Sequence, residues 1–311
     1  MLDLAVIIVS WNVRDYLADC LRSVHVDLDR SNLNGEVWVV DNASTDGTQE
    51  LLADLFPTTH LIINQSNPGF GAANNQGMSV AASRNGQGPR YFLFLNPDTI
   101  VRSGALGYLV SCLDEMPEAG MAGARLVYGD GRFQHSAFNF PGIRQLAFDL
   151  LPVPDRLYDS RLNGRYPRRC YRPKAHPFAV DHTLGAAMLV RSDVAETTGG
   201  FDESYHMYCE EIDWCWRIRQ SGWAIYTVPQ AEIVHYGGES TRQVPSRSIV
   251  DLWGSRALLY QRHHGRLKLA LARRVVNVGM QRKAKKAGNS ELAKAYLEAA
   301  EIWQRCDSTT R

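Results

Sequence analysis

The feature that most constrains the fold is an alternation of two kinds of segment over the first 126 residues. Short runs rich in β-branched and aromatic residues alternate with longer stretches that carry apolar residues at helical spacing. The short runs predict strands at Leu4–Ser10, Glu36–Asp41, His60–Gln65, Tyr91–Asn96 and Gly120–Val127. Strict strand–helix alternation favours right-handed crossovers and a mostly parallel sheet. We therefore expect a Rossmann-like nucleotide-binding half.

The rest of the chain is organised differently. Residues 128–179 are rich in Arg, Pro, Tyr and Gly, which predicts a long excursion over the surface. Order returns with "VDHTLGAAMLVRSDV", a helix through "EEIDWCWRIRQSG" and a strand pair in "AIYTVPQAEIVHY". From about Ser246 the pattern is helical. We therefore predict one domain of residues 1–245, with halves 1–127 and 128–245, and a helical extension of residues 246–311.

Composition excludes some partners. The 34 Lys and Arg residues nearly balance the 33 Asp and Glu residues, so we expect no nucleic acid as partner. The apolar run at the start is much shorter than the roughly 20 residues of a membrane span and has no basic flank. It is read as neither signal peptide nor anchor, and we expect a cytoplasmic protein. The six scattered cysteines form no CxxC pair, which favours reduced structural thiols.

Polar clusters follow each of the first four predicted strands. They are Ser10 and Asn12; Asp41, Asn42, Ser44 and Asp46; Asn67, Gly69 and Gly71; and Asn96 and Asp98. Parallel strands end at one edge of a sheet, where open α/β folds bind ligands. Taken alone, "DNASTDG" is equally consistent with an Asx-rich turn and a helix cap. Four clusters at corresponding positions predict a ligand site.

A series of motifs carries a resemblance to a known family: "VIIVSWN", "VVDNASTDGT", "NPGFGAANNQG", "FLNPDT", "GAAMLVR", "GGFDESYHMYCEEIDWCWR" and "IVHYGGEST". In this order they resemble the family 2 glycosyltransferases with a GT-A fold, and most closely the rhamnosyltransferase-like branch, which builds polysaccharides and cell-wall linkers. The resemblance runs from Leu4 to about Ser248. It implies an α/β protein in which residues 1–127 bind a nucleotide sugar and residues 128–245 bind the acceptor, in one continuous mixed sheet, with C-terminal helices outside it.

The resemblance implies a divalent metal, Mg²⁺ or Mn²⁺, at the end of the fourth strand. There the family's acidic motif holds a cation against the donor's diphosphate, and Asn96, Pro97 and Asp98 stand in its place. Asp98 is the first expected ligand and His235 the second, although a lone histidine at a strand end is more often structural. Asn96 replaces a carboxylate, which predicts weaker metal binding or a contact with ribose or phosphate.

The resemblance also implies a catalytic base. The second acidic residue of "CEEID" is Glu211, which would deprotonate the acceptor hydroxyl. Glu210, Asp213 and Trp214 are candidates for acceptor contacts. On spacing alone, the acidic residues are better explained by a helix N-terminus, and the tryptophan is better explained by the core.

For the nucleotide, Asp41 is the expected contact to the base or ribose. Ser10, Asn12, Asn42 and Asp46 would support it. Gly69 and Gly71 would allow close backbone approach, and Asn74 would face the donor. With Asn96 and Asp98, these residues form the predicted donor site.

The function implied is inverting transfer of a sugar, first L-rhamnose from dTDP-rhamnose, to a hydroxyl of a glycan or lipid-linked glycan. UDP-galactofuranose, GDP-mannose and UDP-N-acetylhexosamine remain alternative donors. A catalytically silent homologue that binds glycan or nucleotide is another alternative, and Asn96 is its best argument. A nucleotidyltransferase would need a glycine-rich basic loop that "VSWNVRDYL" does not supply.

The tail is basic. Between Arg266 and Lys286 it has no acidic residue, and Leu267, Leu271, Val275 and Val278 recur at helical spacing. Its basic residues are Lys268, Arg273, Arg274, Lys283, Lys285 and Arg282. Such a helix is either a solvated face or a peripheral contact with an anionic membrane, here the inner face of the plasma membrane. The sequence leaves a homodimer open.

Overall fold

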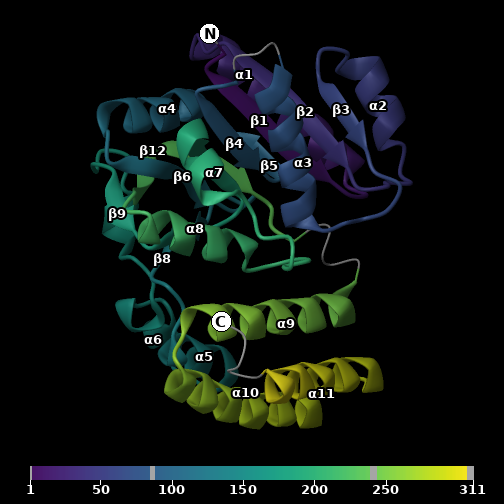
Figure 1. The fold of residues 1–311 in the computed structure, drawn as a ribbon, viewed down its shortest axis with the longest axis vertical. Coiled ribbons are helices and arrows are strands. Elements are labelled where there is room, and N and C mark those ends of the chain that lie inside the picture. The colour runs from purple at the N-terminus through teal and green to yellow at the C-terminus, as the bar shows by residue number, and fades with distance from the viewer. Residues whose placement is uncertain (1, 85–87, 239–243, 307–311) are drawn as a thin grey trace.

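The computed structural model describes residues 2–84, 88–238 and 244–306. Its first part contains the predicted parallel unit (Figure 1). Four strands lie in the order β3-β2-β1-β4 and pair in parallel: β1 (Leu4–Ser10), β2 (Gly35–Asp41), β3 (His60–Ile63) and β4 (Tyr91–Leu95). The connecting helices are α1 (Arg14–Arg30), α2 (Thr48–Leu55) and α3 (Phe70–Ser83). The prediction of a Rossmann-like half is confirmed, with strand ends shifted by one or two residues.

The sheet is covered on both faces because its strands are apolar on both. Along β1, Leu4, Val6 and Ile8 pack in one core cluster, with residues of α1 and of α4 (Ala105–Glu115). Ala5 and Ile7 point to the opposite cluster, with residues of α7 (Ser192–Thr198) and α8 (Glu210–Gln220). This two-sided burial leaves the ends of the strands as the accessible part of the sheet.

The second half of the sheet is mixed, and it corrects one expectation. Between β4 and β6 (Ala119–Val127), β11 (Ala187–Arg191) is inserted antiparallel. The predicted strand pair is one strand, β12 (Ala224–His235), with a register shift between Val228 and Glu232. A further strand, β5 (Thr99–Val101), was not predicted, and it pairs antiparallel with the end of β12.

The excursion of residues 128–179 contains more regular structure than expected. It consists of β7 (Phe133–Gln134), β8 (Ala137–Phe138), α5 (Ile143–Leu150), α6 (Asp155–Tyr158), η2 (Arg161–Asn163), η3 (Arg168–Tyr171) and, at its end, β9 (Phe178–Val180). The strands β7 and β9 extend the sheet beside β6 and β12, while β8 pairs with β10 (His182–Thr183). Helix α5 packs on the C-terminal helices.

The tail forms three helices with a core of their own: α9 (Pro245–His263), α10 (Arg266–Lys286) and α11 (Ser290–Arg305). They lie with α5 at one end of the molecule (Figure 1). Helix α9 begins next to the predicted boundary, and the division into domains stays a prediction. All six cysteines are free, as expected.

Candidate functional site

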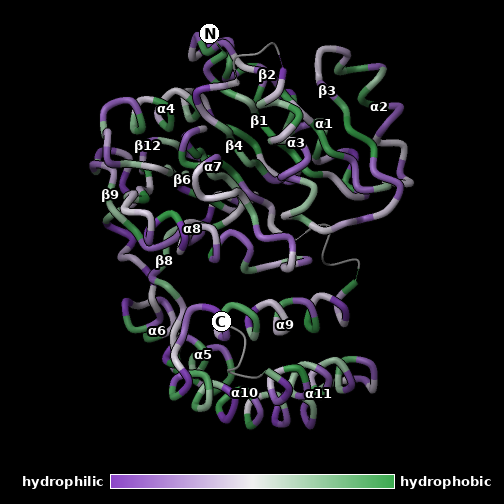
Figure 2. Tube along the Cα trace, viewed as in Figure 1, coloured by the Kyte–Doolittle hydropathy of each residue, from purple (hydrophilic) through white to green (hydrophobic). Residues whose placement is uncertain are grey.

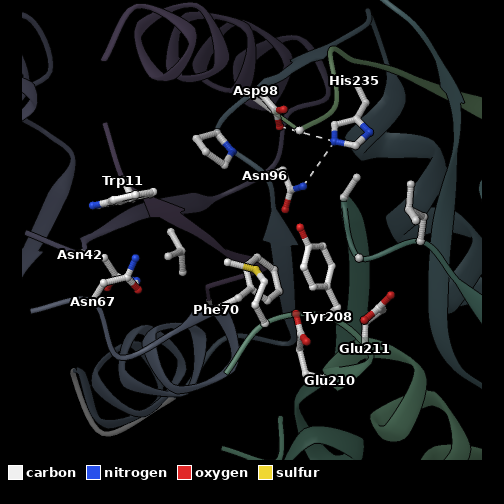
Figure 3. Close-up of a pocket in the computed structure, with 17 residues that line it drawn as sticks. Trp11, Asn42, Asn67, Phe70, Asn96, Asp98, Tyr208, Glu210, Glu211 and His235 are labelled. Carbon is white, nitrogen blue, oxygen red and sulfur yellow. Dashed lines mark hydrogen bonds and ion pairs between the residues drawn. The ribbon is translucent and has the colours of Figure 1, made fainter. Parts of the chain in front are cut away.

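A pocket of about 250 Å³ opens where the strand ends meet (Figure 3). The carboxyl ends of β1, β2 and β4 contribute Trp11, Asn42 and Asn96. Because β11 is antiparallel, its amino end lies at the same edge, and Gly185 lines the pocket as well. The predicted convergence of polar clusters at one edge is therefore present, although some of the predicted side chains lie elsewhere.

Asp98 and His235 meet at one side of this pocket. The pairing of β5 with β12 places Thr99 opposite His235, so the preceding Asp98 lies beside the imidazole. Asp98 Oδ1 is 3.5 Å from His235 Nε2, and Asp98 Oδ2 accepts a hydrogen bond from the Gly237 amide at 3.1 Å. Both side chains are buried.

The neighbours of His235 determine which ring nitrogen is available. Nδ1 lies 3.2 Å from the amide oxygen of Gln134, which can only accept, so Nδ1 carries the proton. Nε2 faces Asp98, and the Asn96 amide nitrogen lies 3.4 Å from it. Nε2 is therefore the ring nitrogen on the side of the carboxylate, where a divalent cation would bind both groups.

Asp98 and His235 fit the expected cation, on the condition that other groups complete its coordination. Within residues 2–84, 88–238 and 244–306 no group of three or more His, Cys, Asp or Glu side chains is placed to hold a metal. Asp98 and His235 would therefore supply two ligands, and the others would come from a bound diphosphate and water. Mg²⁺ is commonly held in this way, by one or two carboxylates and substrate phosphates.

Two carboxyl groups face the pocket from its other side, at the first turn of α8 (Figure 3). Glu211 is partly buried, and burial raises its pKa to about 7, against the opposing effect of the backbone N–H groups at the helix start. Glu210 is buried, and its pKa is raised well above the usual range by burial and by the charge of Glu211. Its Oε2 has no hydrogen-bond partner among the described residues.

The backbone before these carboxyl groups is strained. Tyr208 and Cys209 have φ of 70° and 66°, in the left-handed region that non-glycine residues rarely adopt. Each such residue costs about 1–2 kcal/mol. Tyr208 lines the pocket, and Cys209 caps α8. Strained backbone of this kind is concentrated at functional sites.

On the donor side, the buried polar atoms at the ends of β1 and β2 include two without partners among the described residues, Ser10 Oγ and Asp41 Oδ1. Asn42 lines the pocket, and its amide group binds Asn64 and Asn67 at 2.9 and 3.1 Å. Unpaired buried acceptors and hydroxyls of this kind are costly unless a ligand satisfies them. Of the three residues only Asn42 lines the pocket, and their contact with a nucleotide stays a prediction.

Asn12 and Asp46 act within the protein instead. Asn12 Oδ1 accepts a hydrogen bond from the Thr45 amide at 2.8 Å, and Asp46 Oδ2 accepts one from the Arg14 amide at 2.9 Å. They join the loops that follow β1 and β2 and do not line the pocket. Their oxygens already bind backbone amides, and a direct contact with the donor stays a prediction for both residues.

Three predicted residues near α3 also serve the fold. A Cβ on Gly69, which has φ of 99°, would lie 2.2 Å from the carbonyl oxygen of His206, so the close approach is to this chain's own backbone. Gly71 likewise faces Phe201. Asn74 is buried and donates to the Phe70 carbonyl at 3.0 Å. These positions support the pocket wall and do not face a donor.

Two of the acceptor candidates are corrected in the same way. Trp214 is fully buried, and its indole N–H donates to Thr198 Oγ1 at 2.8 Å. Asp213 is buried and binds His263 at 2.7 Å and Arg217 at 2.8 Å. Neither side chain lines the pocket, and both are used in contacts within the protein.

Sequence reasoning missed several residues that line the pocket. Trp11 lies between two residues that were singled out, and Tyr208 lies two positions before Glu210. Phe70 follows Gly69 and also lines the pocket. The signal that could have identified these three residues is an aromatic side chain inside a polar motif. The last three residues of the "IVHYGGEST" motif, residues 239–241, lie outside the described residues.

Comparison with known proteins shows the family of the chain. The family described as "Glycosyl transferase family 2" matches residues 5–172. The chain is 27% identical over 248 residues to an N-acetylglucosaminyl-diphospho-decaprenol L-rhamnosyltransferase of Mycobacterium tuberculosis. This match covers 78% of this chain and 79% of that protein. It is 24% identical over 255 residues to rhamnosyltransferase WbbL of Escherichia coli, which covers 78% of this chain and 87% of WbbL.

Solved structures share the fold at 14% identity. One is GalNAc-T7, crystallised with UDP, GalNAc and Mn²⁺, with a TM-score of 0.62 over 96% of this chain and 54% of that chain, so this protein spans about half its length. Another is the mannosyltransferase PcManGT of Pyrobaculum calidifontis, in complex with GDP-Man and Mn²⁺, with a TM-score of 0.56 over 97% of this chain and 87% of that chain. The expected GT-A fold is confirmed.

Proposed function

Because the chain belongs to glycosyl transferase family 2 and is a nucleotide-sugar glycosyltransferase, we propose that it transfers L-rhamnose from dTDP-rhamnose with inversion to a hydroxyl of a glycan or lipid-linked glycan. The observation that carries the proposed mechanism is the arrangement of the pocket. Asp98 and His235 lie at one side and Glu211 at the other, with room for a sugar between them.

In this mechanism Glu211 is the base. The acceptor hydroxyl attacks the anomeric carbon of the donor sugar, the bond from that carbon to the diphosphate oxygen breaks, and Glu211 takes the hydroxyl proton. A carboxyl pKa of about 7 suits this role, since an effective base titrates near the working pH. Single displacement at the anomeric carbon inverts its configuration.

Asp98 and His235 would hold a divalent cation, which when bound neutralises charge on the departing nucleoside diphosphate. Asn96, Ser10, Asp41 and Asn42 would orient the nucleotide. Glu210 is the proposed acceptor contact: its carboxyl lines the pocket, and its buried Oε2 is without a partner among the described residues.

The choice of rhamnose depends on the names of the two relatives described above, both of which are rhamnosyltransferases. A titration tests it: dTDP, UDP and GDP are each added to the protein with Mn²⁺ and with EDTA, and the heat is measured. Mn²⁺-dependent binding of dTDP alone supports rhamnose. Preferential binding of UDP or GDP would replace it with a galactofuranose, N-acetylhexosamine or mannose donor.

The Glu211→Gln variant tests the base. Gln has nearly the same shape and cannot accept the proton, so transfer should be lost while nucleotide affinity stays within a few-fold, because donor binding does not depend on this proton transfer. Normal turnover by the variant would refute the assignment. Glu203→Gln is the matched control, since Glu203 is exposed and absent from the pocket lining.

We also propose that α10 contacts an anionic membrane surface. Leu267, Leu271 and Val278 lie at helical spacing and are 89%, 49% and 53% exposed. Arg274, Arg282 and Lys285 are exposed on the same helix, and its buried side is a different set that includes Leu269, Val276 and Met280. Figure 2 shows hydrophobic and hydrophilic segments alternating along α10. In the part of the chain that the structure describes, no helix is long and apolar enough to cross a membrane.

Vesicle sedimentation tests this contact. The protein should bind vesicles of phosphatidylcholine with phosphatidylglycerol and not vesicles of phosphatidylcholine alone. Burial of a Leu side chain contributes about 1.5–3 kcal/mol, so the double change Leu267→Gln with Leu271→Gln should weaken binding at least about tenfold. Leu297→Gln on α11, which is 47% exposed, is the control and should bind as the wild type does. Equal binding by the double variant would contradict the proposal.

A further inference from the structure

Helix α9 of the C-terminal extension contacts the segment that carries both pocket carboxyl groups, residues 202–213, here called the base segment. Ser255 Oγ donates a hydrogen bond to the carbonyl oxygen of Met207 at 2.7 Å. Arg262 forms an ion pair with Asp202 and donates to Ser204 Oγ at 2.8 Å. The contacts thus reach the beginning and the middle of the segment.

The far end of the base segment is held as well. His263 Nε2 lies 2.7 Å from Asp213 Oδ1, and the His263 ring stacks on Trp216 at 4.4 Å between centroids. Between these contacts, Leu259 packs against Tyr205 and Cys209 and is fully buried. Helix α9 therefore covers the segment along its length.

The strained turn lies between these contacts. Ser255 binds the carbonyl of the residue immediately before Tyr208 and Cys209, the two residues with left-handed backbone. Such a conformation persists only where the surrounding structure holds it. Glu211 follows two residues later, so a relaxation of this turn would change the direction of its carboxyl group.

We infer that α9 positions the base, with Ser255 and Arg262 as positioning residues that hold the strained turn before Glu211. This inference depends on the proposed function, in which Glu211 takes the acceptor proton. It changes the predicted division of the chain, because a catalytic unit that ended at residue 245 would lack these contacts. The first helix of the extension belongs with the catalytic unit.

The test uses Ser255→Ala in the full chain. The turnover number should fall on the order of tenfold, because small misplacement of a reacting group has a large effect on rate. The Kd of the nucleoside diphosphate with Mn²⁺ should change less than about twofold, since the donor side is untouched. The control is Ser221→Ala, which removes a hydrogen bond of the same type, from Ser221 Oγ to the Arg217 carbonyl, at the far end of α8.

A second variant, Arg262→Gln, removes the ion pair with Asp202 at the beginning of the base segment. It tests the inference if Ser255→Ala does not fold. Wild-type turnover in either folded variant overturns the inference. Parallel losses of turnover and nucleotide affinity also overturn it, because the disturbance would then not be confined to the base. Failure of the proposed function is a separate result: the wild type would transfer no sugar, or Glu211→Gln would turn over normally.

Discussion

His235 Nε2 lies 3.5 Å from Oδ1 of Asp98, and both side chains are only 8% exposed. The three-residue strand β5 produces this proximity, because its pairing with β12 brings the end of the "NPD" motif beside the end of the last core strand. A buried carboxylate beside an imidazole nitrogen is a pair of ligands that a divalent cation can bind.

The first prediction concerns Asp98. Asp98→Ala removes the only carboxylate of the pair, so nucleoside diphosphate binding should lose its dependence on Mn²⁺. Calorimetric titration with Mn²⁺ and with EDTA measures this directly. An unchanged response to metal would refute the ligand role. Asp130→Ala is the control, since Asp130 is exposed and pairs with Arg132 outside the pocket.

The second prediction concerns Gln134, whose amide oxygen accepts a hydrogen bond from Nδ1 of His235. Gln134→Leu removes this acceptor and frees the imidazole to rotate or change tautomer, so Mn²⁺ affinity should fall roughly 10–100-fold. Gln134→Glu keeps an acceptor and should bind Mn²⁺ at least as tightly as the wild type. Electron paramagnetic resonance of free Mn²⁺ measures both without any turnover. Equal affinities in the two variants would contradict the orienting role.

The sequence predicted the parallel half well because each of its strands is a compact apolar run followed by polar residues, as in Tyr91–Leu95. It could not predict β5, since three residues carry no periodicity of their own. The insertion of β11 between β4 and β6 was equally invisible, because pairing between distant strands leaves no local signal.

Prediction of the site from the sequence is limited in a similar way. Asp98, His235 and Glu211 were identified from motifs, and all three line the pocket. Gly71 and Asn74 belong to an equally distinctive motif, yet they face the protein interior. A motif shows that positions matter, whereas only the packing shows whether a side chain faces the ligand or the core.

The third prediction is a pH dependence. The base acts when ionised, and burial raises the pKa of Glu211 to about 7, so the turnover number should rise with pH through about 7 and level off above it. The positive charge of Arg256 on α9 lowers this pKa, and Glu210 is the neighbouring carboxyl group. Arg256→Gln should therefore move the rise to higher pH.

The control for that shift is Arg247→Gln on the same helix, where Arg247 is exposed and pairs with Asp251. Its pH–rate profile should match the wild type. A profile for Arg256→Gln that falls in height without moving along the pH axis would contradict the electrostatic effect and leave only a packing role for Arg256, which also pairs with Asp149.

The fourth prediction concerns stability. Burial raises the pKa of Glu210 well above its ordinary 4.5, so the folded protein retains a proton that the unfolded chain releases. Stability falls as pH rises wherever the unfolded state binds fewer protons than the folded state. For Glu210 this fall begins above the pKa of the unfolded chain and ends at the pKa of the folded protein. Glu210→Gln has no proton to lose at this position. The difference in free energy of unfolding between the Glu210→Gln variant and the wild type should therefore shift in favour of the variant as pH rises, by up to about 1.4 kcal/mol per pH unit in this window. Urea unfolding at several pH values between about 5 and 8.5 measures the difference, and a gap that stays constant with pH would show that Glu210 ionises normally in the folded protein.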